Sequence, residues 1–170
     1  MTTFDLRTLR IRSGDQAGER VEIEVEPLAL AGQAYEPKPN PAPAELIVTR
    51  ASSGAVLELA LDVALQGPCF RCLQDAELPL QLRLREYQAT KPDSEEERTE
   101  YLEDDRLDLS AWAHDAIALA LPDKILCRPE CAGLCPVCGK DLNAEPHEHV
   151  EERTDPRWAK LRELQHRAPN

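Results

Sequence analysis

The sequence is poor in aromatic residues and has no long apolar run. Only two Phe, three Tyr and two Trp occur among its 170 residues, so a surface that stacks several nucleic-acid bases is poorly supplied. No apolar run approaches the about 18 residues that a transmembrane helix requires. The opening residues, Met-Thr-Thr-Phe-Asp, also lack the basic and apolar stretches of an export signal. These absences predict a soluble, cytoplasmic protein.

Signatures of catalysis are absent as well. The sequence has no glycine-rich phosphate loop and no serine nucleophile elbow, and many of its acidic residues form a run between Lys91 and Asp105 rather than a spaced pair. The net charge of −12 leaves little general attraction for phosphate, although residues 1–12 and 157–167 are locally basic. We therefore predict a non-enzymatic protein, and keep a metal-dependent hydrolase or redox protein as the enzymatic alternative.

Cysteine and histidine are concentrated in two places. The segment C-R-P-E-C-A-G-L-C-P-V-C-G-K-D-L-N-A-E-P-H-E-H spans residues 127–149, and a second C-x-x-C pair occurs upstream at Cys69 and Cys72. A C-x-x-C turn points two thiolates at one ion, and Gly139 supplies the positive φ that such a turn requires. Because cytosolic thiols stay reduced, this spacing indicates zinc binding rather than disulfides.

The candidate ligands can be divided between metal ions in two ways. A closed structural zinc site takes four ligands, so eight candidates fill two sites. In the arrangement that we favour, one site uses Cys69, Cys72, Cys127 and Cys131, and the other uses Cys135, Cys138, His147 and His149. In the competing arrangement, the four downstream cysteines (Cys127, Cys131, Cys135, Cys138) form one site, and Cys69 and Cys72 are left as a redox pair or an empty knuckle.

Alternating apolar and polar residues predict β-strands in the first two-thirds of the chain. The alternation is clear over residues 21–26, 57–66 and 78–85, and one apolar face with one polar face indicates a half-covered antiparallel sheet or an open barrel. Residues 36–44 contain four prolines, which lack N–H donors, and are predicted to form a stiff surface loop rather than a strand.

Two helices are predicted downstream of the strands. Ser110 is the expected cap of a helix that ends before Pro122, with an apolar stripe of Trp112, Ala116, Leu119 and Ala120. Asp155 and Pro156 open a second helix, in which Trp158, Leu161 and Leu164 are spaced to dock on the core. The predicted fold is α+β, mainly an antiparallel β-sheet or open barrel with two helices and a C-terminal zinc-knuckle lobe.

The expected domains are a β-rich core at residues 1–126, which includes one helix and an acidic linker at about 91–105, and a lobe at residues 127–170. The lobe contains the zinc knuckle and the C-terminal helix, and we expect it to pack on the core.

Several motifs together resemble the YceD family of bacterial large ribosomal RNA subunit accumulation proteins. They are C-F-R-C-L, a D-L-S-x-W helix ending in A-L-A-L-P, the block L-C-R-P-E-C-A-G-L-C-P-V-C-G-K-D-L-N, and D-P-R-W-A-K-L. The six cysteines match those of the family, whereas His147 and His149 stand where many members carry C-x-C.

The resemblance implies a non-enzymatic ribosome biogenesis factor that supports 23S rRNA accumulation or processing and large-subunit assembly. The implied partners are pre-ribosomal large-subunit RNA, ribosomal proteins or both, with no membrane and no small-molecule substrate. The alternative is a zinc-stapled adaptor that binds a basic ribosomal protein or a nuclease without touching RNA.

Overall fold

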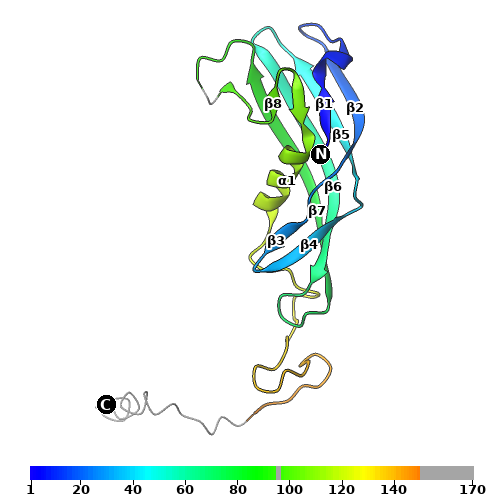
Figure 1. Ribbon diagram of the computed structural model, residues 1–170, viewed down its shortest axis with the longest axis vertical. Helices are drawn as coiled ribbons and strands as arrows, with labels where there is room; N and C mark the ends of the chain where they lie inside the picture. Colours follow the sequence, from blue (N-terminus) through cyan, green and yellow to red (C-terminus); the bar gives the residue numbers. More distant parts are fainter. Residues whose placement is uncertain (95–96, 150–170) are drawn as a thin grey trace, which may run out of the picture. The chain divides into compact units, whose positions relative to one another are not determined.

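The computed structural model of the protein describes residues 1–94 and 97–149 (Figure 1). The chain divides into two compact units, Met1–Cys131 and Ala132–Asn170. The first unit contains every named strand and helix, and the second is described over residues 132–149. No helix in the described ranges is long and apolar enough to cross a membrane.

The first unit is built on an antiparallel sheet around one long strand. Strand β6 (Gly54–Pro68) pairs on one side with β5 (Ala42–Arg50) and then with β4 (Gln33–Lys38), and on its other side with β7 (Asp75–Ala89) along its whole length. The sheet is completed by β2 (Gln16–Ile23) beside β5 and by β3 (Leu28–Leu30) beside β4.

A smaller sheet has the order β1-β9-β8 and is formed by β1 (Thr3–Asp5), β8 (Leu102–Glu103) and β9 (Arg106–Asp108). A short 3-10 helix, Leu6–Leu9, follows β1. All these strand pairs are antiparallel, which confirms the predicted antiparallel sheet, and the sheets do not close into a barrel.

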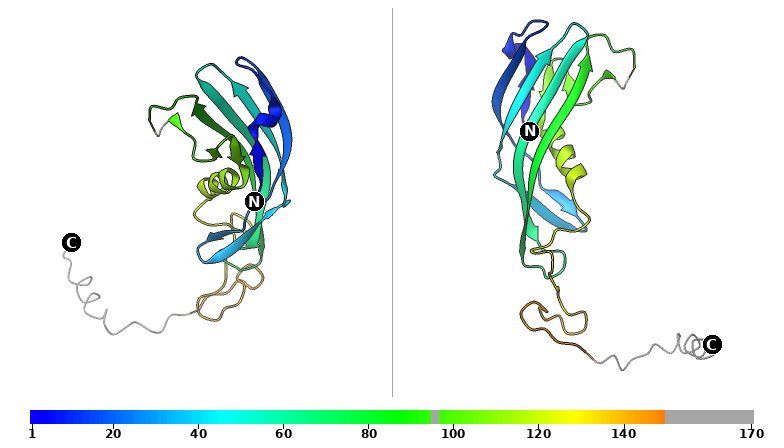
Figure 2. Two further views of the ribbon diagram at one scale, coloured as in Figure 1. Left: turned by 45° about the horizontal axis from the view of Figure 1, so that its top comes forward. Right: turned by 180° about the vertical axis from the view of Figure 1, so that it is seen from behind.

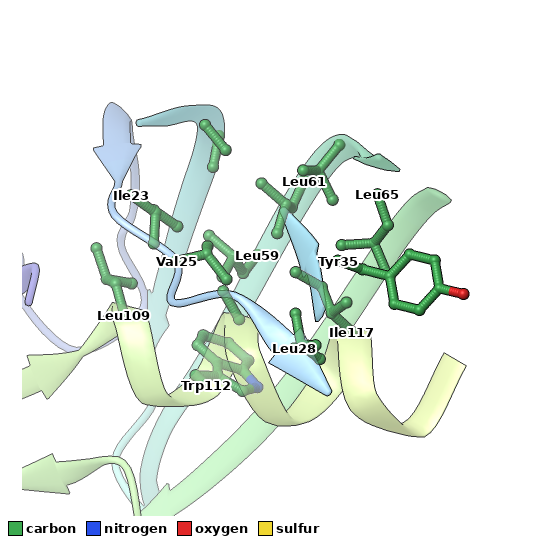
Figure 3. Close-up of a cluster of buried hydrophobic side chains, with 14 of the residues drawn as sticks. Ile23, Val25, Leu28, Tyr35, Leu59, Leu61, Leu65, Leu109, Trp112 and Ile117 are labelled. Carbon is green, nitrogen blue, oxygen red and sulfur yellow. The ribbon is translucent and has the colours of Figure 1, made fainter. Parts of the chain in front are cut away.

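The predicted alternation sets the two faces of the large sheet. Leu57, Leu59, Leu61 and Leu65 of β6 are buried, whereas Asp62, on the opposite face, is exposed. The buried face packs against the helix α1 (Leu109–Ala120), and Figure 3 shows Trp112 and Ile117 of α1 among the strand leucines. Removing these side chains from water supplies the main driving force for folding of this unit.

Helix α1 begins earlier and faces differently from the prediction. The Asp108 side chain caps it by accepting a hydrogen bond from the backbone N–H of Ala111 at 3.0 Å, whereas the Ser110 hydroxyl donates to the backbone oxygen of Glu24 at 2.6 Å. An Asp one residue before the helix competes directly with a Ser inside its first turn. The buried face consists of Leu109, Trp112, Ala113 and Ile117, so of the predicted stripe (Trp112, Ala116, Leu119, Ala120) only Trp112 is buried.

The structure also corrects the prediction for the proline-rich segment. Residues 36–44 do not form one loop, because β4 contains Pro37 and β5 contains Pro43. Residues 39–41 lie between these strands and belong to neither, and the peptide bonds before Pro39 and Pro41 are cis. Strand pairing is found on both sides of this interruption, with Lys38 opposite Ala64 of β6 and Ala42 opposite Ile23 of β2.

The predicted second helix, opened by Asp155 and Pro156, lies outside the described residues. The acidic segment at 91–105 is described apart from residues 95 and 96, and it contributes β8 to the smaller sheet.

Candidate metal centres

The turn between β6 and β7 places Cys69 and Cys72 on one side of a tight loop. The backbone N–H of Cys69 donates to the oxygen of Gln74 at 2.7 Å, and the N–H of Leu73 donates to the oxygen of Cys69 at 3.0 Å. Leu73 has a left-handed backbone, with φ of 62°, which is uncommon for a residue with a bulky side chain. This turn directs both thiols of the hairpin toward the chain that follows α1.

The segment after α1 brings Cys127 and Cys131 to the hairpin. The N–H of Phe70 donates to the oxygen of Ile125 at 2.8 Å, and Arg71 Nη1 donates to the oxygen of Cys131 at 2.7 Å. These bonds hold the two segments together independently of the sulfur atoms. We call Cys69, Cys72, Cys127 and Cys131 the first ligand group, and their four Sγ atoms all lie within 4.8 Å of one another.

The sulfur spacing in the first ligand group fits a tetrahedral ion. The Sγ atoms of Cys69 and Cys131 are 3.8 Å apart, and those of Cys72 and Cys127 are 3.6 Å apart. Four sulfurs at the Zn–S distance of about 2.3 Å would be about 3.8 Å from one another in a tetrahedron, whereas a disulfide requires about 2.0 Å. All six cysteines are free thiols. The group therefore has the donors and spacing to hold a metal ion.

The thiols of the first ligand group have divergent pKa values. Burial raises the pKa of Cys69, but backbone N–H groups, those of Cys72 and Cys127 foremost, outweigh burial and lower this pKa to about 6. Burial and the neighbouring sulfurs raise the pKa of Cys127 to about 12. The thiolate of Cys69 is thus stabilised mainly by the backbone, and further thiolates beside it would add like charge. A cation among them relieves that repulsion.

A second C-x-x-C turn repeats the backbone pattern of the first. The N–H of Cys135 donates to the oxygen of Lys140 at 2.8 Å, and the N–H of Gly139 donates to the oxygen of Cys135 at 2.8 Å. Gly139 has φ of 73° and occupies the position that Leu73 has in the first turn. The predicted role of Gly139 in the turn is confirmed by this geometry.

The second ligand group consists of Cys135, Cys138, His147 and His149, whose ligand atoms also lie within 4.8 Å of one another. Cys138 Sγ lies 3.1 Å from His147 Nε2, somewhat less than the about 3.5 Å expected between sulfur and nitrogen on a tetrahedral zinc ion. The imidazole rings of His147 and His149 meet edge to face, with centroids 4.9 Å apart.

The backbone orients His147 for metal binding. Its Nδ1 lies 2.7 Å from the oxygen of Glu145, and since a carbonyl can only accept, Nδ1 carries the proton and the Nε2 lone pair is left for a metal. This hydrogen bond and the nearby Cys135 raise the pKa of His147. The backbone N–H of Cys138 is the main cause that lowers the pKa of Cys135 to about 6.

The structure brings all eight predicted ligands together, as two sets of four. Each set lies within one unit of the chain, and the grouping is the one that the favoured two-site arrangement predicts. Sequence reasoning missed Arg71, which ties the first turn to Cys131, and Leu73, which adopts the glycine-like conformation. The signal for Leu73 was present, because C-F-R-C-L and C-P-V-C-G align the leucine with Gly139.

Comparisons with known proteins identify one family and several uncharacterized relatives. The family model described as "Large ribosomal RNA subunit accumulation protein YceD" matches residues 57–165. An uncharacterized protein of Mycobacterium tuberculosis is 38% identical over 125 residues, covering 71% of this chain and 60% of the relative. The uncharacterized protein YlbN of Bacillus subtilis is 30% identical over 115 residues, covering 63% of this chain and 66% of that protein.

This chain thus spans about 60% of the length of the mycobacterial protein. No solved structure matches it.

Proposed function

The chain belongs to the YceD family of large ribosomal RNA subunit accumulation proteins, and we propose that it is a non-enzymatic, cytoplasmic factor that supports 23S rRNA accumulation and large-subunit assembly. The family match carries this proposal, because residues 57–165 include most of strand β6, all of strand β7 and helix α1, and both ligand groups. The family name refers to accumulation of an RNA and not to a reaction.

We further propose that both ligand groups bind zinc. Thiolate and imidazole donors in sets of four are typical of structural zinc sites, and a set of four leaves no open position for a substrate. In this proposal, zinc joins the β6–β7 turn to the segment after α1 in the first unit, and fixes the C-P-V-C turn in the second. The metal holds the shape of the surface that meets the ribosomal precursor.

A second candidate function is favoured by the net charge of −12. A negatively charged protein repels the RNA backbone but attracts basic proteins. On this reading, the chain is a zinc-stapled adaptor that binds a basic ribosomal protein, and its effect on 23S rRNA is indirect.

Depletion of the protein in its native cells tests the function. We expect 23S rRNA to fall relative to 16S rRNA, wild-type protein to restore it, and the ligand variant Cys138→Ser to fail at equal protein level. Arg20→Ala, at an exposed position of strand β2, is the control and should restore 23S rRNA fully. Normal 23S rRNA in depleted cells would refute the proposal.

Crosslink mapping on co-sedimenting precursors separates the two candidates. Crosslinks to 23S rRNA support direct RNA contact, whereas crosslinks confined to ribosomal proteins support the adaptor.

A further inference from the structure

Strand β7 forms an edge of the large sheet. It pairs with β6 over its full length, and no other strand of the described chain pairs with it. In the right-hand view of Figure 2, β7 runs along the outer margin of the sheet. An edge strand presents a row of backbone donors and acceptors that another strand can bind.

Two hydrogen bonds show which residues of β7 face outward. At the ends of the β6–β7 ladder, the N–H of Cys69 donates to Gln74 and the N–H of Thr90 donates to Ser53. Hydrogen-bonded and non-hydrogen-bonded pairs alternate along an antiparallel ladder, so the even-numbered residues of β7 bond to β6. The backbone groups of the odd-numbered residues, including Gln81, Arg83, Arg85 and Tyr87, therefore point to the open edge.

A groove of mixed lining lies next to the second half of this edge. It has a volume of about 420 Å³, and apolar side chains, including Leu84, Trp112 and Leu119, line it together with the charged Arg83, Arg85 and Glu86. Leu119 of α1 is 88% exposed. The leucines on the inner face of β7 (Leu78, Leu80, Leu82, Leu84) are only partly buried. Side chains of an added strand would cover this apolar surface.

Two features of the edge disfavour pairing with a second copy of itself. Pro79 directs its ring nitrogen outward and offers no donor, which blocks the first half of the strand. In the second half, antiparallel self-pairing centred on Leu84 would place Arg83 opposite Arg85 of the other copy, and like charges at facing positions are destabilising.

We propose that residues 81–87 of β7 bind an extended segment of a partner protein by strand addition, and that this segment alternates acidic and apolar residues. Its acidic side chains would face Arg83 and Arg85, and its apolar side chains would face Leu84 and Leu119. The ion pairs from Arg83 to Asp62 at 3.1 Å and from Arg85 to Glu58 at 3.9 Å are solvent-exposed. Such pairs are weak, and both arginines can therefore bind acidic residues of the added strand.

This inference goes beyond the ribosomal role and does not depend on it. The test uses the full zinc-loaded chain and a fluorescein-labelled peptide of about nine residues that alternates valine and glutamate. A peptide that alternates valine and lysine is the matched probe. Fluorescence anisotropy should show saturable binding of the glutamate peptide only.

Substitutions then locate the peptide. Arg83→Glu and Leu119→Glu should each weaken binding about tenfold or more, through like charge and through loss of the apolar contact. Arg20→Glu, which changes the same charge on β2 at the far side of the sheet, should have no effect.

Amide hydrogen exchange followed by NMR gives residue-level evidence. The N–H groups of Gln81, Arg83, Arg85 and Tyr87 should exchange quickly in the free protein and slowly in the complex. Those of the even-numbered residues should be protected in both, because they already bond to β6.

Several outcomes would overturn the inference: equal binding of the lysine peptide, unchanged affinity of Arg83→Glu, or slow exchange at residues 81, 83, 85 and 87 in the free protein. Self-association abolished by Leu119→Glu would assign the edge to a second copy instead. Displacement of the peptide by an RNA oligonucleotide would assign it to RNA.

Discussion

Loss of one ligand from the first group should cost the first unit about 4 kcal/mol. A metal ion in this group joins Cys69 to Cys131, which are 62 residues apart. By the chain-entropy relation for crosslinks, closing a loop of that length in the unfolded chain is worth about 4 kcal/mol. Cys69→Ser is nearly isosteric, so this change removes the metal without opening a large cavity. At about 4 °C per kcal/mol, the midpoint of thermal unfolding should fall by about 15 °C.

The assay combines elemental analysis with thermal unfolding followed by the β-sheet circular dichroism signal. Wild-type protein should contain two zinc ions, and Cys69→Ser and Cys138→Ser should each contain one after dialysis against EDTA. Only Cys69→Ser should lower the unfolding midpoint of the sheet, because Cys138 belongs to the other unit. A single zinc ion in the wild type that Cys69→Ser leaves in place, with an unchanged midpoint, would refute the two-site arrangement.

Three further predictions concern the first unit and the second turn. Trp112 is 3% exposed and Leu119 is 88% exposed, so by chemical denaturation Trp112→Ala should cost about 3 to 5 kcal/mol and Leu119→Ala almost nothing. Gly139→Ala should cost about 1 kcal/mol of stability, because φ is 73°; no clash adds to this cost, since no atom lies within 4 Å of the added Cβ. Leu73→Gly should be neutral or stabilising, and equal losses of stability in both variants would contradict the shared turn geometry. Burial and the neighbouring carboxylate of Asp115 raise the pKa of Tyr101 to about 12. The contribution of Tyr101 to folding stability is therefore fully present below its ordinary pKa of about 10 and is lost as the pH rises to about 12. Tyr101→Phe should therefore show a smaller loss of stability over that range than the wild type, and identical pH profiles would show that Tyr101 ionises without consequence.

The strands could be predicted because their burial follows a period of two. Leucines at alternate positions of β6 and β7 pack on one face, and the sequence shows that pattern without reference to any distant residue. The face of α1 was less predictable. Ala116 and Leu119 are as apolar as the buried positions, and only contact with the sheet decides that Ala113 and Ile117 turn inward. Tertiary packing therefore overrides helical periodicity in this short, alanine-rich helix.

The prediction of a loop at residues 36–44 failed for a local reason. Composition alone indicates a loop, but it does not show where each proline falls in a strand. Pro37 lies near the end of β4 and Pro43 near the start of β5, where a missing N–H donor disrupts little of the ladder.

The grouping of the ligands needed the fold. The spacing within each C-x-x-C turn is local and predicted two thiols per ion. The sequence could not decide whether Cys69 and Cys72 share a site with Cys127 and Cys131, or whether the four downstream cysteines form one site without them. The path of the segment after α1 decides it, through hydrogen bonds from Phe70 to Ile125 and from Arg71 to Cys131.

On the proposal that both ligand groups bind zinc, we expect them to depend on the metal to different degrees. The first belongs to a unit with a large apolar core, and hydrogen bonds already hold its two segments together. In the described part of the second unit, residues 132–149, only Gly133 and Cys135 are buried, so this stretch contributes little apolar burial of its own. We therefore expect removal of zinc to unfold the C-P-V-C turn while the sheet of the first unit stays folded. Val137, 65% exposed at the tip of that turn, would then hold a fixed position only in the zinc-loaded protein.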